Sequence, residues 1–225
     1  MKAAAAQPLK IQIAPGDPVS ALLMKPPQAR ACYVFAHGAG AGMAHASMET
    51  IAAGLADRGI ATLRYQFPYM EKGSKRPDSP AVAHAAVRAA VREAARCCPK
   101  LPLIAGGKSF GGRMTSQAQA IEALPDVRGL AFLGFPLHPA GKPSDDRAKH
   151  LSDVKIPMLF LQGTRDALAE LTLLEPVVKR LGPAAMLHRV EAADHSFHVP
   201  ARSGRNDREV MDEILDAFAL WFDRL

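Results

Sequence analysis

Short apolar segments that alternate with helical patterns constrain the fold of this chain more than any other feature. The central segments are apolar at nearly every position, as strands buried on both faces of a parallel sheet are. The first two are more mixed and predict an antiparallel edge. The alternation predicts a doubly wound, mostly parallel α/β sheet with its site at the carboxyl ends of the strands. The predicted strands cover residues 9–13, 21–24, 31–36, 60–65, 101–105, 129–133, 158–162 and 186–191.

Helical patterns occupy the segments between these predicted strands. One helix is predicted over residues 80–96, with Ser79 suited to the N-cap and Pro80 to the first helical position. A last helix is predicted over residues 207–225, where one stripe of apolar side chains indicates packing against the sheet. The stripe consists of Val210, Ile214, Phe218, Trp221 and Leu225.

Size and composition predict one domain spanning residues 1–225, with 48% hydrophobic and 22% charged residues. No apolar run in the sequence is long enough to span a bilayer, and residues 1–6 lack the apolar segment of a signal peptide. Three cysteines, two of them adjacent, suit neither a disulfide framework nor a metal site. We therefore expect a cytoplasmic protein with no membrane partner.

The net charge of +6 is modest, and the basic residues are scattered. One small cluster, Lys72, Lys75 and Arg76, is typical of a solvated loop and could attract an acidic substrate. Basic and aromatic residues are not interleaved, so no nucleic-acid partner is predicted. The sequence does not indicate an oligomeric state.

A glycine-rich turn after the fifth predicted strand carries the clearest chemical signal. Residues 107–111 read Gly-Lys-Ser-Phe-Gly, the G-x-S-x-G pattern of a nucleophile elbow, in which a strained strand-to-helix turn exposes Ser109. Residues 107–109 also match the end of the phosphate-binding motif G-x-x-x-x-G-K-S. Pro102 replaces the first glycine of that motif, however, and has no N–H to donate. A glycine-rich turn with an incidental serine is the remaining alternative.

A serine needs a neighbouring base, and that base needs a third group to orient it. Asp166 and His195 each follow a predicted strand, in the chain order that this fold requires. His195 would take the proton of Ser109, and Asp166 would orient the imidazole. Taken singly, Asp166 also fits a helix N-cap, and His198 is a competing base. Asp194 with the two histidines lacks the spacing of a metal motif, so neither a metal nor a cofactor is predicted.

Backbone N–H groups for an oxyanion are predicted at two places. One belongs to Phe110, directly after the serine, and the other lies in the glycine-rich loop 37–42, much like the HG-x-x loops of esterases. There Ala39 is the first candidate and Gly40 the second. The loop also partly matches a dinucleotide-binding turn, but Met43 occupies the third glycine position, and that alternative leaves the serine turn unexplained.

Together these motifs resemble the α/β-hydrolase superfamily over essentially the whole chain. The small size, without a long insertion after Phe135, is similar to the lidless branch that includes dienelactone hydrolase, although that enzyme has a cysteine nucleophile. Segments 67–71, 106–114 and 134–143 resemble a group of predicted hydrolases related to a testis-expressed protein and a histone acetyltransferase complex subunit. The resemblance implies an α/β-hydrolase fold of about eight strands with no large lid. It also implies the catalytic residues of a hydrolase, but it does not specify which reaction they catalyse.

We therefore expect a serine hydrolase that cleaves a small carboxylic ester or thioester through an acyl-enzyme on Ser109. The family-like loops 67–78 and 135–143 are expected to overhang the site, with Tyr69 and His138 as candidate substrate contacts. The alternative is a non-catalytic binding or regulatory protein on the same scaffold, because a fold does not fix a function.

Overall fold

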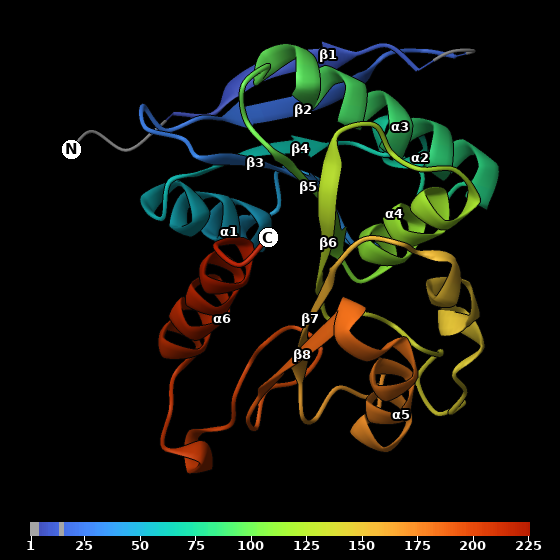
Figure 1. Cartoon of the computed structure of the whole chain (residues 1–225), viewed down its shortest axis with the longest axis vertical. Coiled ribbons are helices and arrows are strands. Elements are labelled where there is room, and N and C mark those ends of the chain that lie inside the picture. The colour runs from blue at the N-terminus through green and yellow to red at the C-terminus, as the bar shows by residue number, and fades with distance from the viewer. Residues whose placement is uncertain (1–4, 14–15) are drawn as a thin grey trace.

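An eight-stranded sheet forms the centre of the molecule (Figure 1). The computed structural model describes residues 5–13 and 16–225, so most of segment 1–6, on which the signal-peptide expectation rests, lies outside the described residues. The strand order is β1-β2-β4-β3-β5-β6-β7-β8; β2 is antiparallel to both β1 and β4, and the other pairs are parallel. The strands are β1 (Gln7–Ile11), β2 (Val19–Met24), β3 (Ala31–Ala36), β4 (Ile60–Tyr65), β5 (Leu103–Lys108), β6 (Val127–Leu133), β7 (Met158–Gly163) and β8 (Ala185–Val190).

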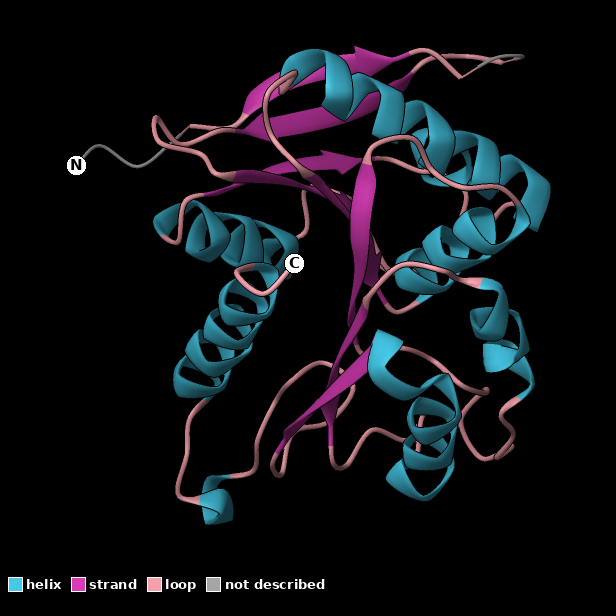
Figure 2. Ribbon diagram, viewed as in Figure 1, coloured by secondary structure: helices cyan, strands magenta, loops and turns pink. Residues whose placement is uncertain are grey.

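Helices cover both faces of the sheet (Figure 2), and one hydrophobic cluster fills the space on each side. Helices α1 and α6 lie on one face, and α3, α4 and α5 lie on the other. The predicted doubly wound architecture is therefore confirmed. The helices are α1 (Ala46–Asp57), α2 (Pro68–Glu71), α3 (Pro80–Cys97), α4 (Phe110–Ile121), α5 (Leu171–Leu181) and α6 (Asp207–Phe222), with 3-10 turns η1 (Asp146–Asp153), η2 (Gly182–Ala184) and η3 (Ala201–Ser203). No helix among the described residues is long and apolar enough to cross a membrane.

The bounds of β5 and α6 differ most from the predicted ones. Strand β5 begins after Pro102, which has no N–H for the ladder, and continues through two glycines to Lys108. Ser79 occupies the N-cap position of α3, but its side chain makes no capping hydrogen bond. Helix α6 ends at Phe222, so Leu225 lies beyond it and is 41% exposed, whereas the other four members of the predicted stripe are buried.

The parallel strands bring four chemically distinctive segments to one edge of the sheet. The loop after β3 carries His37, the turn after β5 carries Ser109, the turn after β7 carries Asp166, and the loop after β8 carries His195. Parallel strands end at the same edge, so residues far apart in the sequence meet there.

Candidate active site

Ser109 lies at the turn between β5 and α4 in a strained backbone conformation. Its φ of 49° and ψ of −116° are uncommon for a residue with a side chain, and its N–H donates to Leu133 O at 3.1 Å. The turn is tight because the flanking glycines touch neighbouring backbone. A Cβ on Gly107 would lie 2.4 Å from Ala36 O, and one on Gly111 would lie 2.6 Å from the same oxygen. The glycines therefore permit the close approach that orients Ser109.

His195 is held in a compact loop after β8. Its Nε2 lies 2.9 Å from Ser109 Oγ, within hydrogen-bonding distance. Asp194 Oδ1 accepts the backbone N–H groups of Ser196 at 2.8 Å and His198 at 3.0 Å, which closes the loop around the histidine. The loop is fixed from within, so the imidazole has little freedom to leave the serine.

Lys108, the residue before the serine, also supports this loop. Its ammonium group donates to the carbonyl oxygen of His195 and lies 4.6 Å from the centre of the Phe197 ring. Burial lowers the pKa of Lys108 to about 8, opposed by the charges of Asp166 and Asp194. The sequence motif treats this position as variable, so its link to the histidine loop emerges only from the structure.

Asp166 completes a continuous chain of hydrogen-bonding contacts. Its Oδ2 lies 2.6 Å from His195 Nδ1, and its side chain is fully buried. Leu168 N donates to Oδ1 at 2.8 Å, and Gln162 Nε2 donates to Oδ2 at 2.5 Å. These donors stabilise the charged carboxylate in a buried position.

Gln162 is a positioning residue that sequence reasoning missed. Besides donating to Asp166, it accepts the Phe135 N–H at 2.8 Å through Oε1, and its side chain is buried. The available signal was a single amide at the end of an otherwise apolar strand, where a buried polar group needs partners.

The structure brings His195, and not the competing His198, to the serine. His198 is exposed, and its Nδ1 lies 2.8 Å from Asp207 Oδ2. Hydrogen bonding to Asp207 raises the pKa of His198 above its ordinary value. This histidine therefore belongs to a surface ion pair that links its loop to the start of α6.

The two predicted oxyanion donors lie in the wall of one cavity with Ser109. Ala39 and Phe110 both line it, and the backbone N–H groups of Ala39, Gly40 and Phe110 have no hydrogen-bond partner within the described part of the chain. Free N–H groups beside a nucleophile are suited to a developing negative charge on oxygen.

His37 fixes the loop that carries Ala39. The imidazole is fully buried, with Nδ1 2.7 Å from Gly38 O and Nε2 accepting the Phe67 N–H at 3.0 Å. Burial lowers the pKa of His37. The ring is therefore a neutral bridge between the loops after β3 and β4.

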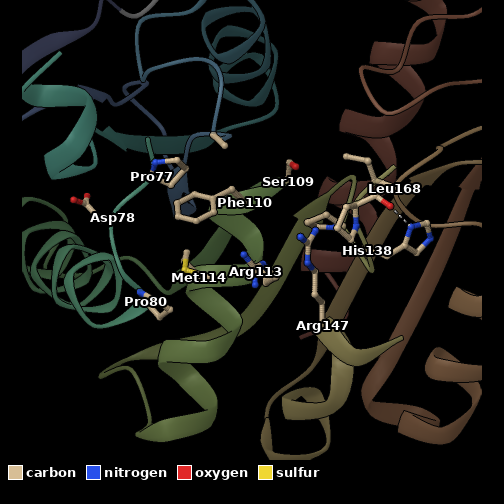
Figure 3. A pocket seen from close by; sticks show the side chains of 13 residues that line it. Pro77, Asp78, Pro80, Ser109, Phe110, Arg113, Met114, His138, Arg147 and Leu168 are labelled. Carbon is tan, nitrogen blue, oxygen red and sulfur yellow. Dashed lines mark hydrogen bonds between the residues drawn. The ribbon is translucent and has the colours of Figure 1, made fainter. Parts of the chain in front are cut away.

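The cavity beside Ser109 has a volume of about 420 Å³ (Figure 3). From the predicted loops 67–78 and 135–143, Pro77, Asp78, Pro136, His138 and Pro139 contribute to its walls, in agreement with the expectation that these loops overhang the site. The complete wall consists of Ala39, Pro77, Asp78, Pro80, Ser109, Phe110, Arg113, Met114, Pro136, His138, Pro139, Arg147 and Leu168.

Of the two expected substrate contacts, one lies in the cavity wall and the other behind it. Tyr69 does not line the cavity; it is 3% exposed and donates its hydroxyl to Ala39 O at 2.9 Å. His138 belongs to the wall, but its imidazole is fully buried, with Nδ1 2.9 Å from Pro139 O and Nε2 3.3 Å from Glu170 Oε2 without hydrogen-bonding geometry. The Tyr69 hydroxyl is used to hold the loop that carries Ala39, and substrate contact by either side chain stays a prediction.

Comparison with known proteins agrees with this fold. A family model described as an α/β-hydrolase domain matches residues 29–223. A dienelactone hydrolase from Anabaena variabilis superimposes with a TM-score of 0.80 at 19% identity, over 99% of this chain and 98% of that one. A lidless α/β serine hydrolase from Xanthomonas campestris superimposes with a TM-score of 0.73 at 19% identity, over 96% of this chain and 94% of that one. An esterase from Pyrococcus furiosus superimposes with a TM-score of 0.75 at 14% identity, over 98% of this chain and 93% of that one.

These likenesses show a small fold built on a mostly parallel sheet, with no large lid among the described residues. The family model covers most of the chain, so the protein belongs to the α/β-hydrolase family.

Proposed function

We propose that this protein is a serine hydrolase that cleaves a small carboxylic ester or thioester through an acyl-enzyme. One observation carries the proposal. A chain of contacts runs from Ser109 Oγ to His195 Nε2 at 2.9 Å and from His195 Nδ1 to Asp166 Oδ2 at 2.6 Å, at a turn that presents the serine to a cavity. This is the geometry that nucleophilic catalysis by serine requires.

In the first half-reaction, Ser109 Oγ attacks the substrate carbonyl carbon while His195 Nε2 takes the hydroxyl proton. Asp166 stabilises the resulting imidazolium, and the N–H groups of Phe110 and Ala39, with Gly40 as the alternative to Ala39, stabilise the oxyanion. The C–O or C–S bond then breaks, and the leaving group receives the proton from His195. In the second half-reaction, water gives a proton to His195 Nε2 as it attacks the acyl carbon. The bond between that carbon and Ser109 Oγ then breaks, Ser109 takes the proton back from His195, and the acid leaves.

Ester chemistry is favoured by the similarity in fold to proteins described as esterases, from Pyrococcus furiosus and Rhodothermus marinus. The three cysteines are free thiols, which suits a reducing compartment such as the cytoplasm. The cavity volume of about 420 Å³ suits a small substrate.

The proposal is tested with p-nitrophenyl acetate and butyrate. Ser109→Ala and His195→Ala should each lower kcat/KM by a factor on the order of 10⁴ or more, because the two groups act as a unit. Circular dichroism and the thermal midpoint should show that both variants remain folded. Wild-type rates in folded Ser109→Ala would refute the proposal and favour a binding protein on this scaffold.

A further inference from the structure

We propose that the cavity beside Ser109 recognises substrates that carry a carboxylate group, through the guanidinium groups of Arg113 and Arg147. The inference rests on the proposed hydrolase function and narrows its substrate class to esters or thioesters with a second, anionic acid group. It is carried by two arginines in the wall that also contains the nucleophile, neither of which has an acidic partner among the described residues.

Arg113 lies on the first turn of α4, and its N–H donates to Ser109 O at 3.1 Å. Its side chain is half-buried and passes the Phe110 ring, with Cζ 5.9 Å from the ring centre. Its Nε is buried and has no hydrogen-bond partner among residues 5–13 and 16–225. A buried guanidinium nitrogen left unpaired is costly, and an incoming anion would satisfy it.

Arg147 reaches the same wall from η1, a segment far from α4 in the sequence. Figure 3 shows the Arg113 and Arg147 side chains on the same side of the cavity, below Ser109 and beside each other. Burial, and next the charge of Arg147, lower the pKa of Arg113. Two neighbouring cations repel each other, and a bound anion between them would relieve that repulsion.

Within residues 5–13 and 16–225, the surroundings provide no acidic partner for either arginine. No ion pair among the described residues includes Arg113 or Arg147, whereas Arg88 on the adjacent helix α3 lies 3.3 Å from Glu122. The single acidic residue in the described cavity wall is Asp78, and one of its oxygens accepts the Tyr69 N–H at 2.8 Å.

The balance of charge in the wall favours a singly charged ligand. Two arginines and one aspartate leave one formal positive charge, which matches one carboxylate better than a doubly charged phosphate. A guanidinium fork also matches the planar carboxylate in two parallel hydrogen bonds. Because Arg113 lies one helical turn from Ser109, the carboxylate should lie only a few carbon atoms from the scissile carbonyl.

The test uses two matched pairs of esters. p-Nitrophenyl hydrogen adipate and p-nitrophenyl hexanoate differ in a carboxylate on the acyl side. 4-(Butyryloxymethyl)benzoate and the corresponding benzamide differ in a carboxylate on the alcohol side. The wild-type protein should prefer the carboxylate member of at least one pair by roughly tenfold or more in kcat/KM, as expected for hydrogen bonds to a charged group.

Arg113→Gln and Arg147→Gln should each reduce that preference by about tenfold, and Arg113→Lys should restore part of it. The matched control is Arg92→Gln, which removes an exposed arginine of α3 and should keep the preference. Thermal unfolding checks that each variant is folded. A wild-type preference for the neutral member of both pairs, or a preference that persists in the Arg113→Gln/Arg147→Gln double variant, would overturn the inference.

A binding measurement separates this inference from the proposed function. If the wild-type protein hydrolyses neutral esters through Ser109 without a charge preference, the anion site is refuted and the hydrolase stands. If it hydrolyses no ester, but Ser109→Ala binds the adipate monoester more tightly than the hexanoate in calorimetry and loses that difference with Arg113→Gln, the anion site stands and the hydrolase is refuted.

Discussion

Gly111→Ala tests the claim that the serine turn depends on close backbone contact. A Cβ at this position would lie 2.6 Å from two carbonyl oxygens, Ala36 O and His37 O. Both belong to the end of β3 and the predicted oxyanion loop, and neither can rotate away as a side chain could. Helix α4 would therefore have to move by at least about 0.4 Å to reach a contact of 3.0 Å.

Two opposing effects decide the stability of this variant. Alanine is favoured over glycine in a helix by roughly 0.8–1 kcal/mol. Overpacking against fixed neighbours costs about 1–3 kcal/mol. Because the carbonyl oxygens of Ala36 and His37 belong to the backbone and cannot rotate away, we expect Gly111→Ala to lie at the upper end of that range. We expect a net loss of about 1–2 kcal/mol, which corresponds to a fall of roughly 2–8 °C in the thermal midpoint of a chain of this size.

The displacement of α4 would also move Ser109 relative to His195. A misplacement of about 1 Å can cost about 100-fold in rate, so a shift of about 0.4 Å should lower kcat roughly five- to tenfold. Urea unfolding and kcat on p-nitrophenyl butyrate measure the two effects on the same protein.

Gly54→Ala in α1 is the matched control. It receives the same gain in helix propensity, but its Cβ would meet Leu215 Cδ1 at 2.3 Å, and that methyl group can rotate away. We expect its stability to remain within about 1 kcal/mol of wild type, with no change in kcat. If Gly111→Ala proved as stable and as active as Gly54→Ala, the reasoning about the serine turn would be wrong.

Three further predictions concern the ionisable groups. Asp166→Asn should lower kcat by a factor on the order of 10⁴, because the amide no longer stabilises the His195 imidazolium; a loss below tenfold in steady-state assays would contradict that role. His198→Gln should change kcat less than twofold, since His198 is exposed and paired with Asp207; loss of activity in this variant would favour it as the base. Burial and then the neighbouring arginine charge lower the pKa of His150 to about 4, below its ordinary 6.5, so the unfolded chain binds the additional proton. Stability should therefore fall as the pH drops from 6.5 to 4, and the free energy of unfolding in urea should depend less on pH in His150→Gln than in wild type. An identical pH dependence in the two proteins would contradict the lowered pKa of His150.

The sheet and the three residues of the proposed triad could be predicted because their signals are local. Ser109 lies within a five-residue glycine motif, and Asp166 and His195 each follow a strand that apolar runs identify. The topology of parallel strands then requires these ends to meet. The bounds of β5 differed from the prediction because Pro102 interrupts the ladder and the glycines after it continue the strand.

The supporting contacts could not be predicted because they depend on packing between distant segments. Tyr69 turns its hydroxyl to Ala39 instead of the cavity, and no spacing in the sequence encodes that direction. Arg113 and Arg147 meet only because η1 packs against α4. Gln162 was the exception that residue chemistry could have identified, as a polar group in a buried strand.

Covalent labelling of the folded protein with a fluorophosphonate tests the central claim most directly, because the reagent reports an activated serine without assuming a substrate. Intact mass and peptide mapping should show one adduct per chain on Ser109. The adduct should be absent in Ser109→Ala and greatly slowed in His195→Ala, since the histidine activates the hydroxyl. An unlabelled Ser109 in wild-type protein, or equal labelling rates in wild type and His195→Ala, would contradict the account.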